Sequence, residues 1–327
     1  MILPILIDNA KQEVLNTNGY VSFDFIDDNC CKAILKWIDL KNLTDTNTYS
    51  SYKKRLFSLE LYLENHNYLA NQLSPFLPNF FMNYKIVFSR FLVKKCSNEA
   101  FIPAHQDRQF TDLNDERYPS YILWIPLVDV SLKNGTIGFL KGSHLTYKAP
   151  PPPFPDPRVK RFSDETIFEM FPYLEFNSFK AGQAVLFDVR TFHGSLPNFS
   201  KMERTAIRID LCHEDAQLVT YYLKKESKGK LMTKFKVDDL FYTRFPNEKL
   251  LEIYDNDEPF PSEILSVENY FLVEKTITEY LQEHNKLLIQ NGLILNKKIA
   301  LIVKKKKYYS NLVYRIQTFF SRFNFSN

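Results

Sequence analysis

The stretch AGQAVLFDVRTFHGS, residues 181–195, joins a short apolar run to a histidine. The run Ala184–Asp188 is bounded by turn residues, which is typical of a buried strand. Four further runs of this kind occur in the middle of the chain, at Lys85–Val93, Tyr121–Val130, Thr136–Leu140 and Arg204–Cys212. Several short strands joined by Gly and Pro turns indicate a sandwich or a barrel, so we expect a mainly β core.

The residues before this core favour helices. Asp27 and Asp28 can cap a helix over Cys30–Leu40, and a second helix is expected over Ser58–Leu73. A short strand is expected at Gly19–Phe23. The chain is therefore predicted to be α+β, with helices flanking the β core.

Helical patterns return after about residue 215, notably over Ser266–Leu288. We expect a core domain over residues 1–215 and a mainly helical C-terminal extension over residues 216–327. The basic run Lys304–Lys307 lies among apolar residues near the end of the chain. It is read here as the solvated face of a packed helix, and the alternative is weak contact with an acidic carrier protein or an anionic membrane surface.

The composition excludes several classes of protein. Only 8 of 327 residues are Gly, against a usual share of about 7%, and neither the G-x-G-x-x-G nor the G-x-S-x-G motif occurs. The formal charge of +4 gives no indication of a nucleic-acid partner. The 4 cysteines lack C-x-x-C spacing, and no uncharged apolar run approaches the roughly 18 residues of a membrane span. We expect a cytoplasmic protein with reduced thiols.

A metal site is indicated by His105 and Asp107 together with His193. On extended backbone, residues two apart point to the same side, so His105 and Asp107 can reach one ion. A histidine that follows an apolar strand is more often structural than a ligand, so the prediction depends on the sheet bringing His193 to this pair. Two histidines and one carboxylate with open positions are the ligand set of non-haem Fe(II) oxygenases.

Arg204 follows His193 by eleven residues and begins the last predicted core strand. Its guanidinium could bind a co-substrate carboxylate through two parallel hydrogen bonds, which Lys would do less well. The alternative is an exposed strand residue or a partner for a neighbouring carboxylate.

From about Ser89 to Cys212 the sequence resembles the phytanoyl-CoA dioxygenase (PhyH-like) family of Fe(II)/2-oxoglutarate oxygenases. The shared motifs are, in order, HQD (105–107), YILWIPLVDV (121–130), NGT (134–136), GSH (142–144), AGQAVLFD (181–188) and HGS (193–195), followed by Arg204. With Gly19-Tyr20-Val21 included, the resemblance covers roughly residues 15–215.

The resemblance implies a double-stranded β-helix core, which is jelly-roll or cupin-like, with iron held by His105, Asp107 and His193. It also implies four residues that bind or line the site of 2-oxoglutarate: Arg204 on its far carboxylate, with Gln106, Trp124 and Ser195. Arg208, on the same strand face as Arg204, is the fallback carboxylate partner.

The implied activity is that of a dioxygenase that uses Fe(II), 2-oxoglutarate and O2. We expect it to hydroxylate an unactivated C–H bond of a small or carrier-bound substrate, acyl-like or a secondary metabolite, with release of succinate and CO2. Halogenating relatives lack a carboxylate at the position of Asp107, so its presence favours hydroxylation. The alternative is a non-catalytic jelly-roll binding module or a peripheral membrane protein that uses the basic C-terminal segment.

Overall fold

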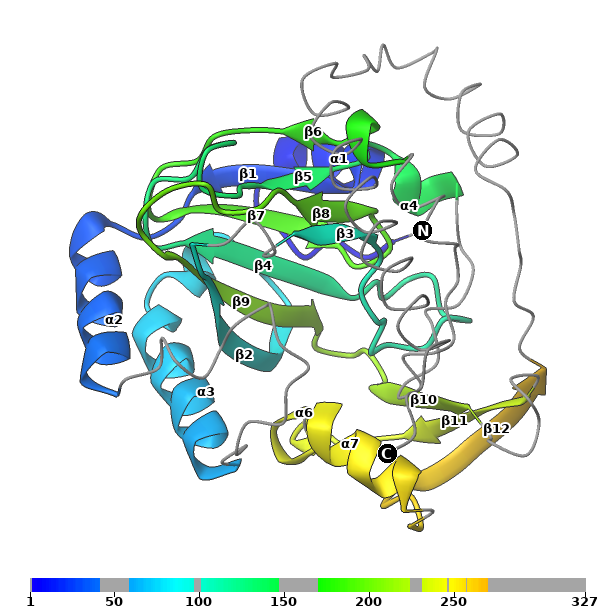
Figure 1. The fold of residues 1–327 in the computed structure, drawn as a ribbon. Helices are drawn as coiled ribbons and strands as arrows, with labels where there is room; N and C mark the ends of the chain where they lie inside the picture. Colours follow the sequence, from blue (N-terminus) through cyan, green and yellow to red (C-terminus); the bar gives the residue numbers. More distant parts are fainter. Residues whose placement is uncertain are drawn as a thin grey trace, which may run out of the picture. The chain divides into compact units, whose positions relative to one another are not determined.

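The structure is a computed structural model that describes residues 2–41, 59–96, 101–146, 170–223, 231–245, 247–256 and 258–269 (Figure 1). The chain divides into two compact units: Met1–Arg161 with Glu175–Glu274, and Phe162–Leu174 with Lys275–Asn327. Residues 170–174 are the described part of the second unit, and they include the 3-10 helix η3 (Phe171–Tyr173). All other elements named below belong to the first unit.

Two antiparallel sheets form the centre of the first unit. The larger sheet has the order β1 (Tyr20–Asp24), β7 (Gln183–Asp188), β4 (Tyr121–Pro126), β9 (Arg204–His213) and β2 (Tyr84–Lys94). The smaller sheet has the order β3 (Ile102–His105), β8 (His193–Ser195), β5 (Ile137–Phe139) and β6 (Glu175–Phe176). The five core strands expected from the sequence are all present.

The two sheets pack face to face, as Figure 1 shows for β5 and β8 beside β7 and β4. Ile122 and Trp124 of β4 share one buried apolar cluster with Ile137 and Phe139 of β5. The prediction of a mainly β core with flanking helices is confirmed. Its jelly-roll form stays a prediction.

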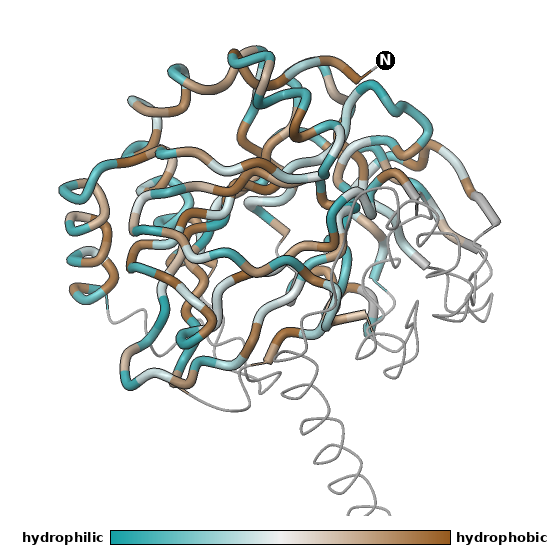
Figure 2. The backbone as a smooth tube through the Cα atoms, turned by 90° about the horizontal axis from the view of Figure 1, so that it is seen from above, coloured by the Kyte–Doolittle hydropathy of each residue, from teal (hydrophilic) through white to brown (hydrophobic). Residues whose placement is uncertain are grey.

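Short helices surround the sheets. They are α1 (Asn9–Asn18), α2 (Asp28–Leu40), α3 (Leu59–Leu73), η2 (Leu77–Asn79) and α4 (Ser143–Thr146). The expected cap of α2 is present, because the Asp27 side chain accepts a hydrogen bond from the backbone N–H of Cys30. Figure 2 shows α2, at the left, alternating between hydrophilic and hydrophobic residues along its turns, as a helix with one buried face does.

Both faces of the larger sheet are buried, and the side chains of β9 alternate between these faces as predicted. Ile207, Ile209 and Leu211 lie in the cluster that also holds Ile34 of α2 and Leu69 of α3, so helices cover this face. Arg204, Ala206 and Arg208 point to the other face, toward the smaller sheet. One face of β9 therefore packs into the apolar core, and its other face places two arginines in the space between the sheets.

The region after residue 215 differs from the prediction. It contains a three-stranded antiparallel sheet, β10 (Val219–Leu223), β11 (Leu231–Lys236) and β12 (Glu263–Asn269), and the helices α6 (Phe241–Arg244) and α7 (Asn247–Asp255). The expected helix over Ser266–Leu288 is wrong for Ser266–Asn269, which pair with β11. Pairing with a strand distant in sequence overrides the local helical pattern. Residues 270–288 and Lys304–Lys307 lie outside the described residues.

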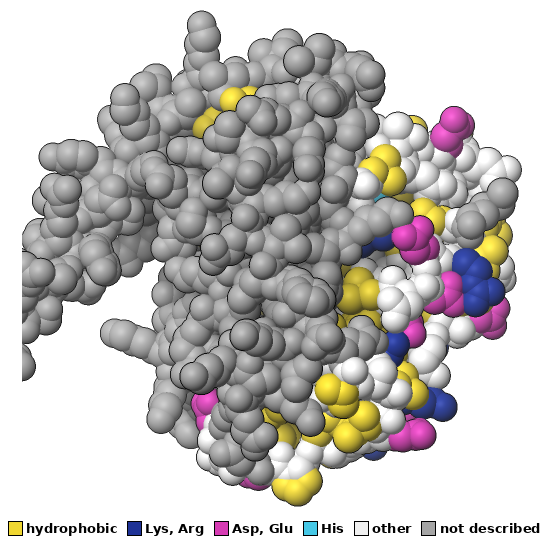
Figure 3. Space-filling model, turned by 90° about the vertical axis from the view of Figure 1, so that its right-hand side faces the viewer, with side chains coloured by type: hydrophobic (Ala, Val, Ile, Leu, Met, Phe, Trp, Pro, Cys, Tyr) yellow, Lys and Arg dark blue, Asp and Glu magenta, His cyan; other side chains and the backbone are white. Residues whose placement is uncertain are grey.

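Charged and hydrophobic side chains are interspersed over the described part of the face in Figure 3. Within the described ranges, no helix is long and apolar enough to cross a membrane.

Gly182 stands at a turn where no other residue fits. Its φ is +83°, and an added Cβ would lie 2.1 Å from the carbonyl oxygen of Ile26. The Gly182 carbonyl in turn accepts hydrogen bonds from the backbone N–H groups of Phe25 and Ile26, both at 3.1 Å. We expect Gly182→Ala to lower the free energy of unfolding by more than about 2 kcal/mol, because strain and overlap add together.

Gly142→Ala is the matched control for this substitution. Gly142 also has a positive φ, +74°, but its added Cβ would meet only the Thr17 carbonyl oxygen at 3.8 Å. The free energy of unfolding of Gly142→Ala should fall by about 1 kcal/mol, from backbone strain alone. Urea unfolding measures both variants, and equal losses would contradict the steric account of Gly182.

Candidate metal centre

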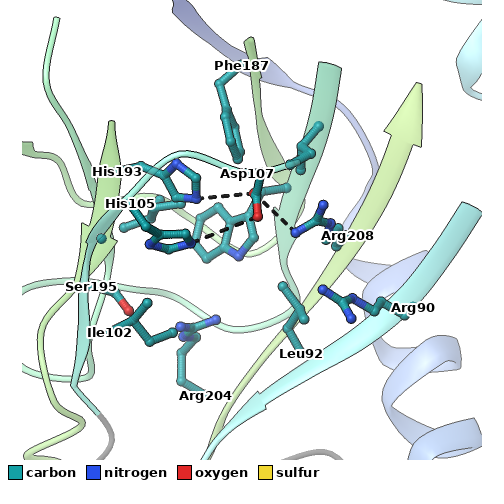
Figure 4. Close-up of a pocket in the computed structure, with 14 residues that line it drawn as sticks. Arg90, Leu92, Ile102, His105, Asp107, Phe187, His193, Ser195, Arg204 and Arg208 are labelled. Atoms are coloured by element: carbon teal, nitrogen blue, oxygen red, sulfur yellow. Dashed lines mark hydrogen bonds and ion pairs between the residues drawn. The ribbon is translucent and has the colours of Figure 1, made fainter. Parts of the chain in front are cut away.

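His105, Asp107 and His193 meet between the two sheets. His105 ends β3 and lies opposite His193 of β8 in the register of the smaller sheet, so their ring centroids are 4.3 Å apart. Asp107 follows two residues later, with one carboxylate oxygen 3.3 Å from Nε2 of His193 and the other 3.9 Å from Nε2 of His105. Figure 4 shows the three side chains converging. One ligand atom from each lies within 4.8 Å of the others, as binding of one metal ion requires.

Backbone carbonyls orient both imidazoles. Nδ1 of His105 is 2.8 Å from the Pro103 carbonyl oxygen, and Nδ1 of His193 is 2.9 Å from that of Thr191. Each Nδ1 is assigned as the N–H donor because a carbonyl can only accept. Both Nε2 lone pairs are then directed at the space beside Asp107. The donor set fits Fe(II), which two histidines and one carboxylate bind in non-haem oxygenases.

The electrostatics keep these ligands ready for a metal. Burial lowers the pKa of His105 to about 4, and the neighbouring His193 adds to the effect. Burial alone would raise the pKa of Asp107, but Arg208 and the two histidines hold it well below its usual value. At neutral pH, His105 is therefore neutral and Asp107 is ionised, which are the states that bind metal.

Histidines that are buried or partly buried make the metal-free protein sensitive to acid. Burial lowers the pKa values of His66, His105 and His144 below the ordinary 6.5, so the unfolded chain takes up these protons first as the pH falls. The folded state should therefore lose stability between about pH 6.5 and about pH 4, the value for His105. We expect the melting temperature in EDTA to be lower at pH 5 than at pH 7.

His66 offers a control for this pH effect away from the metal centre. Its Nδ1 accepts the backbone N–H of Ser89 at 3.1 Å, which requires a neutral ring. A His66→Gln variant should show a shallower fall in melting temperature. A melting temperature that rises toward pH 5 would contradict this assignment.

The metal-binding cluster opens into a pocket between the sheets. Trp124, Ser195, Arg204 and Arg208 line it. That the first three bind or line the site of 2-oxoglutarate stays a prediction. Arg204 is buried, with its guanidinium carbon 5.4 Å from the centroid of the Trp124 ring. Arg208 instead lies between two carboxylates, with Nη1 3.1 Å from Asp107 and Nε 2.6 Å from Asp210. Arg208 thus pairs with one of the three converging side chains, whereas Arg204 lines the pocket beside Trp124.

Gln106 is the predicted site residue that the structure does not bring to the pocket lining. Its side-chain amide donates to the carbonyl of Arg190, whose guanidinium pairs with Asp188. The physical reason is the alternation of side chains along the chain that continues from β3: His105 and Asp107 point to the candidate metal position, so the residue between them points away.

A family model describing phytanoyl-CoA dioxygenase (PhyH) matches residues 37–206, which is more than half of the chain. The chain belongs to the phytanoyl-CoA dioxygenase family. Among curated proteins, none matches it.

Several solved structures are similar to this family member. One is the non-heme alpha-ketoglutarate-dependent carbocyclase SnoK from nogalamycin biosynthesis, at 16% identity and TM-score 0.46 over 65% of this chain and 86% of that chain. EvdO2 from Micromonospora carbonacea var. aurantiaca has 16% identity and TM-score 0.43 over 65% of this chain and 94% of that chain. HygX from Streptomyces hygroscopicus with nickel and 2-oxoglutarate bound has 15% identity and TM-score 0.42 over 63% and 87%.

Enzymes of the phytanoyl-CoA dioxygenase family depend on Fe(II) and 2-oxoglutarate. The described residues of this member supply the matching ligand set, His105, Asp107 and His193. Fe(II) and 2-oxoglutarate are therefore its cofactors.

Sequence reasoning missed two basic residues of β2. Lys94 is fully buried and its Nζ donates to Oγ of Ser195 and to the Leu196 carbonyl, both at 2.6 Å. Burial, together with the charge of Arg204, holds the pKa of Lys94 well below its usual value. Arg90 lines the pocket on the same face of β2. Alternation along the predicted strand Lys85–Val93 was the available signal, but that strand stopped one residue short of Lys94.

Residues after position 215 form hydrogen bonds and an ion pair with the loop that follows Asp107. The backbone N–H of Val219 donates to the Phe110 carbonyl at 2.9 Å, and that of Leu113 donates to Oη of Tyr221 at 3.0 Å. Lys234 pairs with Asp112 at 3.2 Å. The three-stranded sheet therefore anchors the loop that follows Asp107 in this family member, a role that the sequence did not indicate.

Proposed function

We propose that this protein is a dioxygenase that hydroxylates an unactivated C–H bond of a small or carrier-bound substrate and releases succinate and CO2. The observation that carries the proposal is the complete His105, Asp107 and His193 cluster at a pocket that also contains Arg204. When bound, Fe(II) with 2-oxoglutarate supplies the activation of O2 for C–H oxidation.

Arg204 binds the far carboxylate of 2-oxoglutarate in this proposal. A buried guanidinium provides two parallel donors, and the Trp124 ring holds it from one side. Ser195 lines the same part of the pocket, and its hydroxyl is fixed by the hydrogen bond from Lys94. These contacts would orient the co-substrate before the reaction.

The apolar lining excludes water and holds the C–H bond. Leu92, Ile122, Ile137 and Phe187 line the pocket around the cluster. Such walls suit a substrate with an apolar part, since they replace water at the reacting carbon.

Asp107 supports hydroxylation over halogenation. Its carboxylate fills the ligand position that lacks a carboxylate in halogenating relatives, and Arg208, itself held by Asp210, keeps that carboxylate directed toward the histidines. Asp107, held by Arg208, thus occupies the third ligand position, so a halide could not bind the metal there.

A succinate-release assay with candidate acyl, carrier-bound and secondary-metabolite substrates tests the proposal. Succinate and hydroxylated product should form together, in amounts that depend on Fe(II) and O2, and His105→Ala should form neither. Formation of an oxidised product that carries no new hydroxyl group would contradict hydroxylation as the reaction type. Failure of the wild type with Fe(II) to bind 2-oxoglutarate would contradict the whole proposal.

A further inference from the structure

Arg90 is a positively charged residue of the pocket that the metal centre does not use. It is half-buried, it reaches from β2 into the pocket beside Leu92 (Figure 4), and it lines the same cavity as the metal-binding cluster. Its Nε atom is buried and has no hydrogen-bond partner among the described residues. No described carboxylate pairs with it, in contrast to Arg208.

The register of the larger sheet explains where Arg90 stands. Arg90 lies opposite Arg208 of β9, and Arg208 lies opposite Trp124 of β4, so the three side chains form one row across the sheet. Lys94 and Arg204 form a parallel row, four residues away along β2 and β9. At the rise of a strand, the two rows are about 13 Å apart. Arg90 and Arg204 therefore start from different rows of this face, and the Arg204 guanidinium reaches back to the Trp124 ring of the first row.

This placement is unfavourable unless Arg90 gains a partner. Like charges directly opposite on neighbouring strands destabilise a sheet, and a partly buried charge without a counter-charge costs free energy. Arg208 is compensated by Asp107 and Asp210, whereas Arg90 is not. A bound anion would remove this cost and satisfy the orphaned Nε.

We propose that Arg90 binds a carboxylate of the substrate. The inference rests on the proposed function, in which Arg204 binds the co-substrate and Arg90 is left for the substrate. A guanidinium matches a carboxylate with two parallel donors. Beside it, Leu92 and Ile122 would hold the apolar part of the same molecule. The substrate class is thus a carboxylate-bearing molecule with an apolar body.

Binding of matched probes tests this assignment on the full chain without co-substrate. Titration calorimetry with phenylacetate and its neutral analogue phenylacetamide should show at least about tenfold tighter binding of the acid, the usual gain of a charge-assisted hydrogen bond. Arg90→Met should bind both probes equally, and Arg90→Lys should keep part of the preference. Equal or absent binding of the two probes by the wild type would overturn the proposal, as would tighter binding of phenyl phosphate than of phenylacetate.

A second measurement separates ligand binding from a structural role. Without ligand, Arg90→Met should melt at the same temperature as the wild type or about 2–4 °C higher, because an uncompensated charge is removed. A lower melting temperature would mark Arg90 as structural and overturn the proposal.

The co-substrate provides the last control. With Fe(II) present and O2 excluded, Arg90→Met should bind 2-oxoglutarate within about twofold of the wild type, as expected for a group outside its contacts. Weakening comparable to that in Arg204→Met would assign Arg90 to the co-substrate and overturn the inference. Absence of 2-oxoglutarate binding in the wild type would instead refute the proposed function, since the phenylacetate preference is measured without it.

Discussion

Replacing Asp107 with alanine is expected to abolish succinate formation and to weaken Fe(II) binding by more than about a hundredfold. Loss of groups that merely orient metal ligands already costs 10- to 100-fold as a rule, so loss of a direct ligand should cost more. The substitution also removes one of the two carboxylates that compensate Arg208, which places a positive charge beside the metal position. Anaerobic Fe(II) titration and the succinate assay measure the two effects.

Two further variants sharpen this test. Arg208→Met keeps all three ligands but frees the Asp107 carboxylate, so its Fe(II) affinity should fall by about 10- to 100-fold. Asp129→Ala removes an exposed carboxylate that pairs with Lys180 on the surface, and should behave as the wild type. Normal Fe(II) binding by Asp107→Ala would show that the cluster is not the iron site.

Replacing Arg204 with methionine is expected to weaken 2-oxoglutarate binding by about 30-fold or more. Truncating one partner of a buried, hydrogen-bonded charge pair typically costs 2–5 kcal/mol, which corresponds to about 30-fold or more in affinity. The buried Arg204 guanidinium beside Trp124 meets this condition once the co-substrate carboxylate is bound. Anaerobic calorimetry with Fe(II) present measures the affinity.

The companion measurements isolate the role of Arg204. Fe(II) binding should be unchanged, because all three side chains of the metal-binding cluster are kept. Arg117→Met, which removes an exposed guanidinium paired with Asp115, should leave 2-oxoglutarate binding intact. An equal loss of 2-oxoglutarate affinity in both arginine variants would point to an effect of net charge. Unchanged affinity in Arg204→Met would refute the role of Arg204 in binding the co-substrate.

The strands that the sequence predicted are those with a strong local signal. β4 and β7 are short runs of apolar residues, and β9 alternates apolar and polar residues along its whole length. β3 and β8, which carry the two histidines, have only 4 and 3 residues and no apolar pattern. They are strands because each finds a partner in the smaller sheet, and the same cause produced β10, β11 and β12 where helices were expected.

The sequence by itself indicated the three candidate metal ligands of this protein. His105 and Asp107 are two residues apart, and His193 stands in a motif of its own after an apolar strand, so residue type and motif order can be recognised without the structure. The tertiary structure alone decided the neighbours of these residues. Sheet register sets Arg90 beside Arg208 and Lys94 beside Arg204, and the packing of two sheets brings Ser195 to Lys94. Burial and the distances between charges fix what each basic group can bind, and both arise only when strands far apart in sequence pair.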